Sequence, residues 1–416
     1  FALNVLRGIR EKCGEDFVIN LLVSADEMHP QGMRFEETKE FLRMLEDHVD
    51  IVTVSCGLHT DIRYYRYWLP NMYMPRMVNV RYAGELKKIL KCKVAAVGGI
   101  ANLDEAERVL SEGLADFCAM TRPLMADPEM PRKYAKNCPE KRIPCARCGS
   151  CGDRISVAKP LICAVNPRLG REGELEDGLV RPARVKKTVA VVGGGPAGMQ
   201  AALTLLERGH RPVLFEKEKT LGGNLAAAAS PLRPDMREYC EHLCQAVLQS
   251  GADIRLGVKA SPRLIGELKP DALIIAVGAE PLRPDVLGID LPHVHWAAKA
   301  ASGKAELGRE IAIIGGGTLG LESAYAQSQE GRKVRLFEIR SALGGTMDKN
   351  ELMPALEKNG VEIYTSRRLL AVYPDHIVCE ELATGALEEH PCDTVLIAAG
   401  LKSRKRDVEA LRHLLP

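Results

Sequence analysis

Short apolar runs alternate with amphipathic helical patterns over residues 1–135. A run of apolar residues predicts a buried strand, and apolar residues three or four positions apart predict a helix. The predicted strands are Val18–Val23, Ile51–Ser55, Val94–Val97 and Asp116–Met120, and the predicted helices are Glu36–Leu45, Tyr82–Leu90 and Leu103–Ser111. Successive strand–helix units favour a parallel sheet. A closed β/α barrel needs about eight strands, so this stretch is interpreted as the second half of such a barrel.

Residues 187–416 contain an internal repeat, a signal of duplicated structural units. The run Val191-Val192-Gly193-Gly194-Gly195 recurs as Ile313-Ile314-Gly315-Gly316-Gly317, at an offset of 315 − 193 = 122 positions. Glu216 recurs at the same offset as Glu338. Each glycine run follows a predicted strand, Thr188–Val192 in the first copy, and opens a predicted helix. Two tandem βαβ nucleotide-binding units are the simplest account.

The two ends of the chain suggest that it is part of a longer polypeptide. It begins at Phe1, inside an amphipathic helical pattern that no capping residue precedes. It ends at Pro416, soon after a strand-like segment. We therefore expect further residues on both sides in the whole protein.

Composition narrows the class of protein. The chain has 416 residues, of which 57 are basic and 55 acidic, so its net charge of +2 predicts no nucleic-acid or membrane partner. No apolar run approaches the roughly 20 residues of a membrane span. Its 13 cysteines, in a long chain without an export signal, indicate thiols or metal ligands in a reducing cytoplasm. The sequence leaves the oligomeric state open, a homo-oligomer included.

A cysteine cluster marks residues 136–186, which otherwise show little periodicity and are predicted to form a loop-rich module and linker. Its members are Cys145, Cys148, Cys151 and Cys163. Closely spaced thiolates followed by a fourth from farther along the chain suit a [4Fe–4S] cluster. A Cys₄ zinc site is the main alternative, and a chance grouping of buried thiols is the other. We favour [4Fe–4S], because three cysteines in seven residues crowd a single zinc ion.

Each glycine motif has the surroundings that dinucleotide binding requires. In the first, Gly193 permits the tight turn, Gly195 lets the backbone approach a pyrophosphate, and Gly198 packs the helix on the strand. Glu216 ends the next predicted strand, where a carboxylate can bind ribose hydroxyls. The alternative is a glycine turn without a ligand. The matching strand, helix and acid argue against this alternative.

The second motif is Gly315, Gly317 and Gly320, with Glu338 after the predicted strand Lys333–Phe337. An acid at this place repels the 2′-phosphate of NADP and accepts a hydrogen bond from the free 2′-hydroxyl of NAD. The sequence therefore favours NADH over NADPH. Arg340 follows two residues later, so binding of NADPH stays an alternative.

Several motifs in one order give the chain a family resemblance. Gly98-Gly99 and Thr121-Arg122 follow barrel strands, the cysteine module ends Cys163-Ala164-Val165-Asn166-Pro167, and Gly193-Gly194-Gly195-Pro196-Ala197-Gly198-Met199 comes last. Together they resemble the iron–sulfur flavoenzymes of the old yellow enzyme class, which include 2,4-dienoyl-CoA reductase, 2-enoate reductase, bile-acid and flavonoid ene-reductases, and trimethylamine dehydrogenase. The resemblance covers essentially the whole chain.

The resemblance implies an α/β architecture with four parts. These are the C-terminal half of an FMN-binding β/α barrel (1–135), a [4Fe–4S] module and linker (136–186), a Rossmann-like FAD domain (187–300) and an NAD(P)H domain (301–416). The family's closing FAD segment would lie beyond Pro416.

The resemblance also assigns residues to cofactors. The FMN residues would be Gly98, Gly99, Thr121 and Arg122; the FAD residues Gly193, Gly195, Ala197, Gly198, Glu216, Gly223, Asn224 and Gly278; the NAD residues Gly315, Gly317, Gly320 and Glu338. His59, in Gly57-Leu58-His59, matches a histidine that faces the substrate beside the FMN. A loop histidine without a role is the alternative. The family's proton-donating tyrosine would lie upstream of Phe1.

Two positions depart from the family pattern. Leu22 stands where members carry an arginine that contacts the flavin, and Thr121 stands where most have glycine. The change at Leu22 affects FMN binding most directly.

Three functions follow as hypotheses. The leading one is an NADH-dependent ene-reductase that passes electrons from NADH through FAD and the cluster to FMN. It would reduce the C=C bond of a small unsaturated carbonyl compound such as an enoate, enoyl thioester, steroid or flavonoid. The second is an amine dehydrogenase of the trimethylamine dehydrogenase type, and the third a non-catalytic electron-transfer subunit. The intact second nucleotide motif counts against the amine dehydrogenase, which needs no nicotinamide site.

Overall fold

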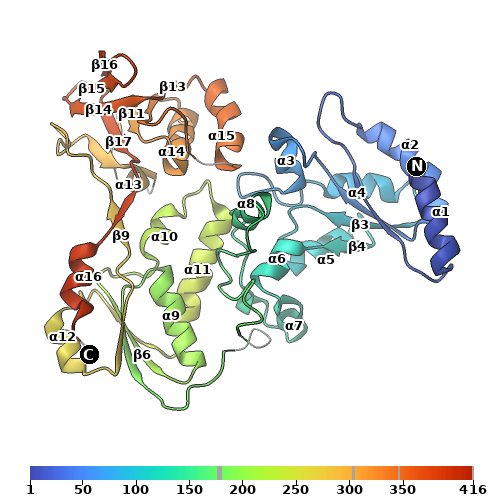
Figure 1. Cartoon of the computed structure of the whole chain (residues 1–416), viewed down its shortest axis with the longest axis horizontal. Helices are drawn as coiled ribbons and strands as arrows, with labels where there is room; N and C mark the ends of the chain where they lie inside the picture. Colours follow the sequence, from blue (N-terminus) through green and yellow to red (C-terminus); the bar gives the residue numbers. More distant parts are fainter. Residues whose placement is uncertain (176–179, 302–304, 345–346, 415–416) are drawn as a thin grey trace. The chain divides into compact units, whose positions relative to one another are not determined.

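The structure is a computed structural model that describes residues 1–175, 180–301, 305–344 and 347–414. It divides into two compact units, Phe1–Gly170 and Arg171–Pro416, which we treat separately (Figure 1). Residues 176–179 of the predicted linker lie outside the described residues. The predicted division into four parts stays a prediction.

The first unit is built on a four-stranded parallel sheet in the order β1-β2-β3-β4. Its strands are β1 (Asn20–Ser24), β2 (Ile51–Ser55), β3 (Lys93–Val97) and β4 (Phe117–Ala119). Its helices are α1 (Ala2–Cys13), α2 (Phe35–Leu45), α3 (Ile62–Trp68), α4 (Val80–Lys87), α5 (Leu103–Ser111), α6 (Thr121–Ala126), α7 (Met130–Ala135) and α8 (Ser150–Ser156). The four strands lie side by side in the order in which they occur along the chain, with helices between them. This confirms the predicted parallel α/β arrangement.

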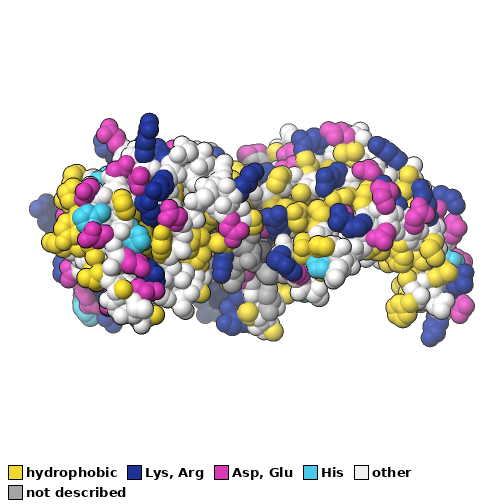
Figure 2. Space-filling view, turned by 90° about the horizontal axis from the view of Figure 1, so that it is seen from above, with side chains coloured by type: hydrophobic (Ala, Val, Ile, Leu, Met, Phe, Trp, Pro, Cys, Tyr) yellow, Lys and Arg dark blue, Asp and Glu magenta, His cyan; other side chains and the backbone are white. Residues whose placement is uncertain are grey.

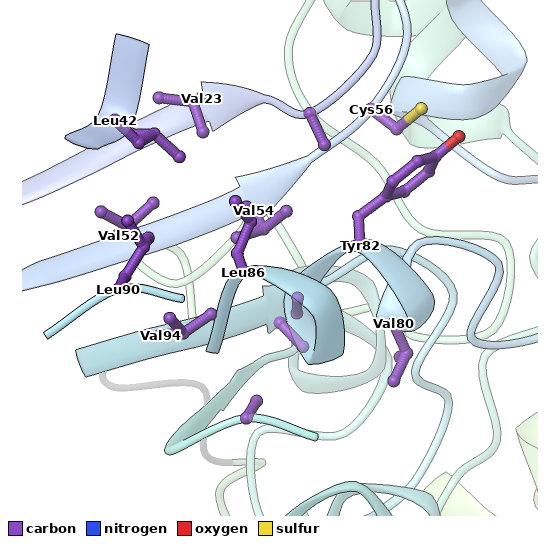
Figure 3. Packing of buried hydrophobic residues seen from close by; sticks show 14 of the residues in the cluster. Val23, Leu42, Val52, Val54, Cys56, Val80, Tyr82, Leu86, Leu90 and Val94 are labelled. Carbon is purple, nitrogen blue, oxygen red and sulfur yellow. The ribbon is translucent and has the colours of Figure 1, made fainter. Parts of the chain in front are cut away.

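The core of this unit lies between the sheet and its helices. Val52 and Val54 of β2, Val94 of β3 and Leu86 of α4 are fully buried and belong to one hydrophobic cluster, labelled in Figure 3. The three valines come from the apolar runs that predicted the strands. The Asn102 side chain accepts a hydrogen bond from the Glu105 backbone N–H, which caps α5 where the sequence predicts that the helix begins.

The second unit contains two parallel sheets that reflect the internal repeat. The first has the order β7-β6-β5-β8 and the second β10-β17-β11-β12-β13. The strands are β5 (Thr188–Val192), β6 (Arg211–Glu216), β7 (Asp253–Leu256), β8 (Ala272–Ile275), β10 (Val294–Trp296), β11 (Glu310–Ile314), β12 (Lys333–Phe337), β13 (Glu362–Tyr364) and β17 (Thr394–Ile397). In both sheets the strand before the glycine motif is an inner strand and pairs with the strand that leads to the acid: β6 ends in Glu216, and Glu338 directly follows β12.

Helices and two smaller sheets complete this unit. The helices are α9 (Pro196–Glu207), α10 (Gly223–Ala228), α11 (Pro234–Leu248), α12 (Pro262–Leu268), α13 (Ala297–Ala301), α14 (Thr318–Gln329), α15 (Met347–Lys358) and α16 (Lys405–Arg412). An antiparallel sheet, which the sequence analysis did not predict, has the order β14-β15-β16. Its strands are β14 (Arg367–Val372), β15 (His376–Glu381) and β16 (Leu387–Pro391), and β18 (Leu401–Ser403) pairs with β9 (Ala279–Pro281).

The surface agrees with the near-zero net charge. Basic and acidic side chains are intermixed on the face shown in Figure 2. Among helices within the described residues, none is both long and apolar enough to cross a membrane.

Candidate cofactor-binding sites

The first candidate site is a cavity of about 380 Å³ in the first unit, called here the barrel cavity. It lies where β2, β3 and β4 end, the edge at which parallel barrels place their ligands. Four predicted FMN residues, Gly98, Gly99, Thr121 and Arg122, line it together. The fold thus brings the loop after β3 and the loop after β4 together at this cavity.

Arg122 gives this cavity an anion-binding character. Its Nη1 atom is buried and has no hydrogen-bond partner among the residues that the structure describes. A buried guanidinium nitrogen without a partner is costly, and a phosphate group would satisfy it. Gly98 has a φ of 121°, and a Cβ there would lie 2.4 Å from Asn79 Nδ2, so only glycine fits. These residues fit the phosphate end of FMN.

Leu22 also lines the barrel cavity and is 61% exposed. Its apolar side chain lies where the family resemblance would place an arginine. The cavity wall continues with Tyr65 and Trp68 of α3. His59 is exposed and lies beside these rings, 5.0 Å from the Trp68 ring and 5.7 Å from the Tyr65 ring, but is not among the residues that line the cavity. Its predicted role stays a prediction.

The four predicted cluster ligands line a second, smaller cavity of the first unit, called here the cysteine cavity. Cys145, Cys148, Cys151 and Cys163 surround it together with Arg122. Burial raises the pKa of Cys145 to about 11, and Arg122 acts in the opposite direction. Burial likewise raises the pKa values of Cys151 and Cys163. A group that binds thiolates would overcome this cost, because metal coordination favours the deprotonated form.

Among the described residues, no three His, Cys, Asp or Glu side chains are close enough together to bind a single metal ion. The choice between iron–sulfur cluster and zinc therefore stays a prediction. The two cavities are adjacent, because Arg122, Met125 and Cys151 line both of them.

A buried arginine that sequence reasoning missed holds the cysteine loop in place. Arg147 is only 3% exposed, and its guanidinium donates hydrogen bonds to the carbonyl oxygens of Asn71, Met74 and Pro75. The Met72 N–H donates in return to the Arg147 carbonyl at 3.1 Å. The position of Arg147 between Cys145 and Cys148 was visible in the sequence, but its partners lie more than 70 residues away.

The first glycine motif connects β5 to α9 as predicted. Gly193 has a φ of 113°, and a Cβ there would lie 2.3 Å from the Ala276 carbonyl oxygen. A Cβ at Gly198 would lie 1.9 Å from the Gly193 oxygen, which confines this position to glycine. Gly195 has open space where a Cβ would be, so its backbone is accessible to a ligand. These three environments match the roles expected of a pyrophosphate loop.

The other predicted FAD residues surround this loop. A Cβ at Gly223 would lie 3.1 Å from Gly195 Cα. The Asn224 Nδ2 atom donates to the Ala279 carbonyl at 3.1 Å, one residue after Gly278. Ala197 is exposed in the first turn of α9. The structure therefore gathers three separate stretches of the first nucleotide unit at the amino end of α9.

Glu216 makes contacts that the sequence did not predict. Its Oε2 atom accepts a hydrogen bond from the Gly194 N–H at 2.6 Å, and its Oε1 atom accepts one from the Glu218 N–H at 2.8 Å. The carboxylate thus fastens the glycine loop. It also lines a cavity of about 320 Å³ whose wall includes three basic residues, Lys217, Lys259 and Arg404, which sequence reasoning did not single out.

The second glycine motif repeats this geometry. A Cβ at Gly320 would lie 1.8 Å from the Gly315 oxygen, and Gly317 has open space around it. Glu338 accepts a hydrogen bond from the Gly316 N–H at 2.7 Å. Burial alone would raise the pKa of Glu338, but hydrogen bonds from Arg340 and Gly316 outweigh burial and hold the pKa below its ordinary value.

Two family models match the chain. The pyridine nucleotide-disulphide oxidoreductase model matches residues 187–413, more than half of the chain. The NADH:flavin oxidoreductase / NADH oxidase family model matches residues 1–141. The fold and the motifs thus define a protein that joins a portion of a flavin-binding barrel to a Rossmann-like dinucleotide region. The chain belongs to the pyridine nucleotide-disulphide oxidoreductase family, in the 2,4-dienoyl-CoA reductase-like group that the sequence resembles.

Individual relatives agree with this assignment. The chain is 35% identical to an NADH oxidase of Thermoanaerobacter brockii, over 90% of this chain and 58% of the relative. It is 31% identical to a bilirubin reductase of Mediterraneibacter gnavus, over 99% of this chain and 65% of the relative. The solved structure of a 2-naphthoyl-CoA reductase with 2-naphthoyl-CoA matches with a TM-score of 0.91 and 26% identity, over 100% of this chain and 63% of that one. The chain thus spans about three-fifths of the length of these relatives.

Proposed function

We propose that the chain is part of an NADH-dependent ene-reductase that reduces the C=C bond of a small α,β-unsaturated carbonyl compound. One observation carries this proposal. The barrel cavity contains a buried Arg122 nitrogen that has no hydrogen-bond partner within the described part of the chain, and it shares three lining residues with the cavity that the four cysteines surround. A flavin site and a cysteine-ligated redox site that share a wall are suited to exchanging electrons.

Each group has a set of residues that fits it. Gly98, Gly99, Thr121 and Arg122 would hold FMN, the four cysteines a [4Fe–4S] cluster, and the two glycine motifs FAD and NADH. When bound, these groups supply hydride transfer at the flavins and single-electron transfer at the cluster. The protein itself contributes orientation and charge.

The side chains of the barrel cavity would act on the flavin and the substrate in different ways. Arg122 would neutralise the phosphate and, through the shared wall, lower the cost of thiolates in the cysteine cavity. Tyr65 and Trp68 would provide an apolar surface for the substrate and exclude water. His59 lies against the Trp68 ring, and among the described residues it is our candidate for assisting protonation of the substrate α-carbon.

The proposal is tested first by cofactor content. Acid release followed by chromatography should give FMN and FAD in equal amounts per chain of the purified protein, and metal analysis should give about four iron atoms rather than one zinc. FAD without FMN would refute the reductase and favour an electron-transfer subunit. The cause would then be either an incomplete barrel or the leucine at position 22.

A matched pair of variants tests the role of the cysteine cavity. Cys145→Ser removes a cavity residue, whereas Cys138→Ser changes a thiol that donates to the Lys133 carbonyl and does not line the cavity. Under anaerobic conditions NADH should bleach both flavins in the Cys138→Ser protein, but only the FAD in the Cys145→Ser protein. Bleaching of both flavins in Cys145→Ser, or no reduction of any enoate or enone by the reduced wild type, would contradict the proposal.

A further inference from the structure

The internal repeat allows the two nucleotide units to be compared position by position. In the first, Glu216 accepts hydrogen bonds from the backbone N–H groups of Gly194 and Glu218. In the second, Glu338 accepts them from the backbone N–H groups of Gly316 and Arg340, at 2.7 and 2.9 Å. The carboxylates therefore fasten their glycine loops in the same way. The side chains two residues beyond the acid are what differ.

Arg340 adds a side-chain contact that the first unit lacks. Its Nε atom donates to Glu338 Oε1 at 2.9 Å. At the matched position, 340 − 122 = 218, the first unit has an acid, Glu218. The second nucleotide site therefore has a guanidinium where the first has a second carboxylate.

The arginine also lies against the phosphate-binding loop. A Cβ at Gly344 would lie 2.8 Å from Arg340 Nη2, so the guanidinium rests on this glycine. The Gly344 N–H donates to the Gly316 carbonyl at 2.9 Å, which ties the same segment to the glycine motif. At the matched Gly222, the nearest side chains are those of Ala226 and Cys240, neither of which is a cation.

These contacts change what the acid can do. Both Glu338 oxygens already accept hydrogen bonds and the side chain is 5% exposed, whereas the Arg340 side chain is 63% exposed. A lone carboxylate would repel a 2′-phosphate, but here the Arg340 guanidinium neutralises the Glu338 carboxylate. Most of the surface of the Arg340 side chain is still exposed to solvent. An arginine near this edge is the usual partner of a 2′-phosphate.

We propose that Arg340 sets the nucleotide selectivity of the second unit, and that this unit binds nucleotides with a 2′-phosphate as well as those with a free 2′-hydroxyl. The inference rests on the nicotinamide site of the proposed function. It differs from the preference for NADH that Glu338 alone predicts.

Two ligands that differ only in the 2′-phosphate, 5′-AMP and adenosine 2′,5′-bisphosphate, provide the test. Binding of each is measured by calorimetry to the FAD-loaded protein, so that the first site is filled and no turnover is needed. The wild type should bind both with affinities within about tenfold. Arg340→Gln should weaken the bisphosphate by about tenfold or more and change 5′-AMP by less than threefold, as expected for loss of a charge-assisted hydrogen bond.

Arg368→Gln is the matched control. Arg368 also pairs with a glutamate, Glu380 at 3.3 Å, and its side chain is similarly exposed at 52%, but it lies on the antiparallel sheet. This variant should bind both ligands as the wild type does. Circular dichroism of both variants checks that they fold.

The outcomes separate the inference from the proposed function. If the wild type binds 5′-AMP but discriminates against the bisphosphate by a hundredfold or more, or if Arg340→Gln leaves the ratio unchanged, the inference is wrong and the nicotinamide site stands. If the wild type binds neither ligand, both the inference and the nicotinamide site are wrong.

Discussion

Substituting alanine at two glycines of the first nucleotide motif should separate folding from cofactor binding. Gly195 and Gly198 are three residues apart and undergo the same addition of one methyl group. At Gly198 the new Cβ would lie 1.9 Å from the Gly193 oxygen, whereas real Cβ contacts stay above 3.0 Å. The backbone must therefore move by at least 3.0 − 1.9 = 1.1 Å. At Gly195 the new methyl group meets no protein atom within 4 Å.

The two variants should differ in stability and agree in FAD loss. Overpacking at Gly198 should cost about 3 kcal/mol, at the upper end of the usual range, because the atom it strikes belongs to the backbone. Gly195 has a φ of −76°, which alanine adopts readily, so this variant should be as stable as the wild type or up to about 1 kcal/mol more stable. Its methyl group, however, occupies the space through which a pyrophosphate would approach.

The assay combines urea unfolding of the FAD-free protein with flavin content after reconstitution. Gly198→Ala should lower the unfolding midpoint, and Gly195→Ala should not, while both should retain little FAD. Equal destabilisation by the two variants would refute the reasoning from Cβ contacts. Normal FAD content in Gly195→Ala would refute the assignment of this loop to the pyrophosphate.

Three other predictions concern buried charges. Arg147→Met should destabilise the first unit by about 2–4 kcal/mol in thermal unfolding, because buried carbonyls lose a charged donor. Glu322→Gln should cost the second unit about 3–5 kcal/mol, since it breaks the buried ion pair with Arg233, and adding Arg233→Met should recover much of that loss. The lowered pKa of Glu338 means that the unfolded chain binds its proton more readily. Its stabilising contribution should therefore be present at neutral pH and be lost as the pH falls through its unfolded and then its folded pKa. Glu338→Gln should remove this part of the acid dependence of unfolding.

The regular elements were predictable because their signals are local. The strand Ile51–Ser55 and the helix Leu103–Ser111 have the predicted bounds. The first strand begins at Asn20 rather than Val18, since Val18 is 63% exposed and precedes the pairing with β2. The glycine motifs lie at the predicted strand–helix junctions, where backbone contacts confine Gly193, Gly198 and Gly320 to glycine.

The features that sequence reasoning missed depend on distant partners. In the sequence, Arg147 is one of several charged residues in a predicted loop. Only the fold shows that its side chain is buried against carbonyl groups of residues more than 70 positions away. The antiparallel sheet escaped prediction because its burial alternates imperfectly: Ala371 and Val372 are both buried, next to a register shift between Leu369 and Ala371. The hydrogen bonds of Glu216 and Glu338 to their glycine loops likewise needed coordinates.

The wall shared by the two cavities of the first unit has a consequence for how the protein matures. Helix α8 contributes Cys151, Gly152 and Ile155 to the barrel cavity, and it follows directly on the loop that carries Cys145 and Cys148. If the proposed cluster is bound there, a chain that has not acquired it would present an incomplete pocket to the flavin. We expect iron-starved cells to yield protein poor in FMN as well as in iron, so that one nutrient would govern the occupancy of both prosthetic groups.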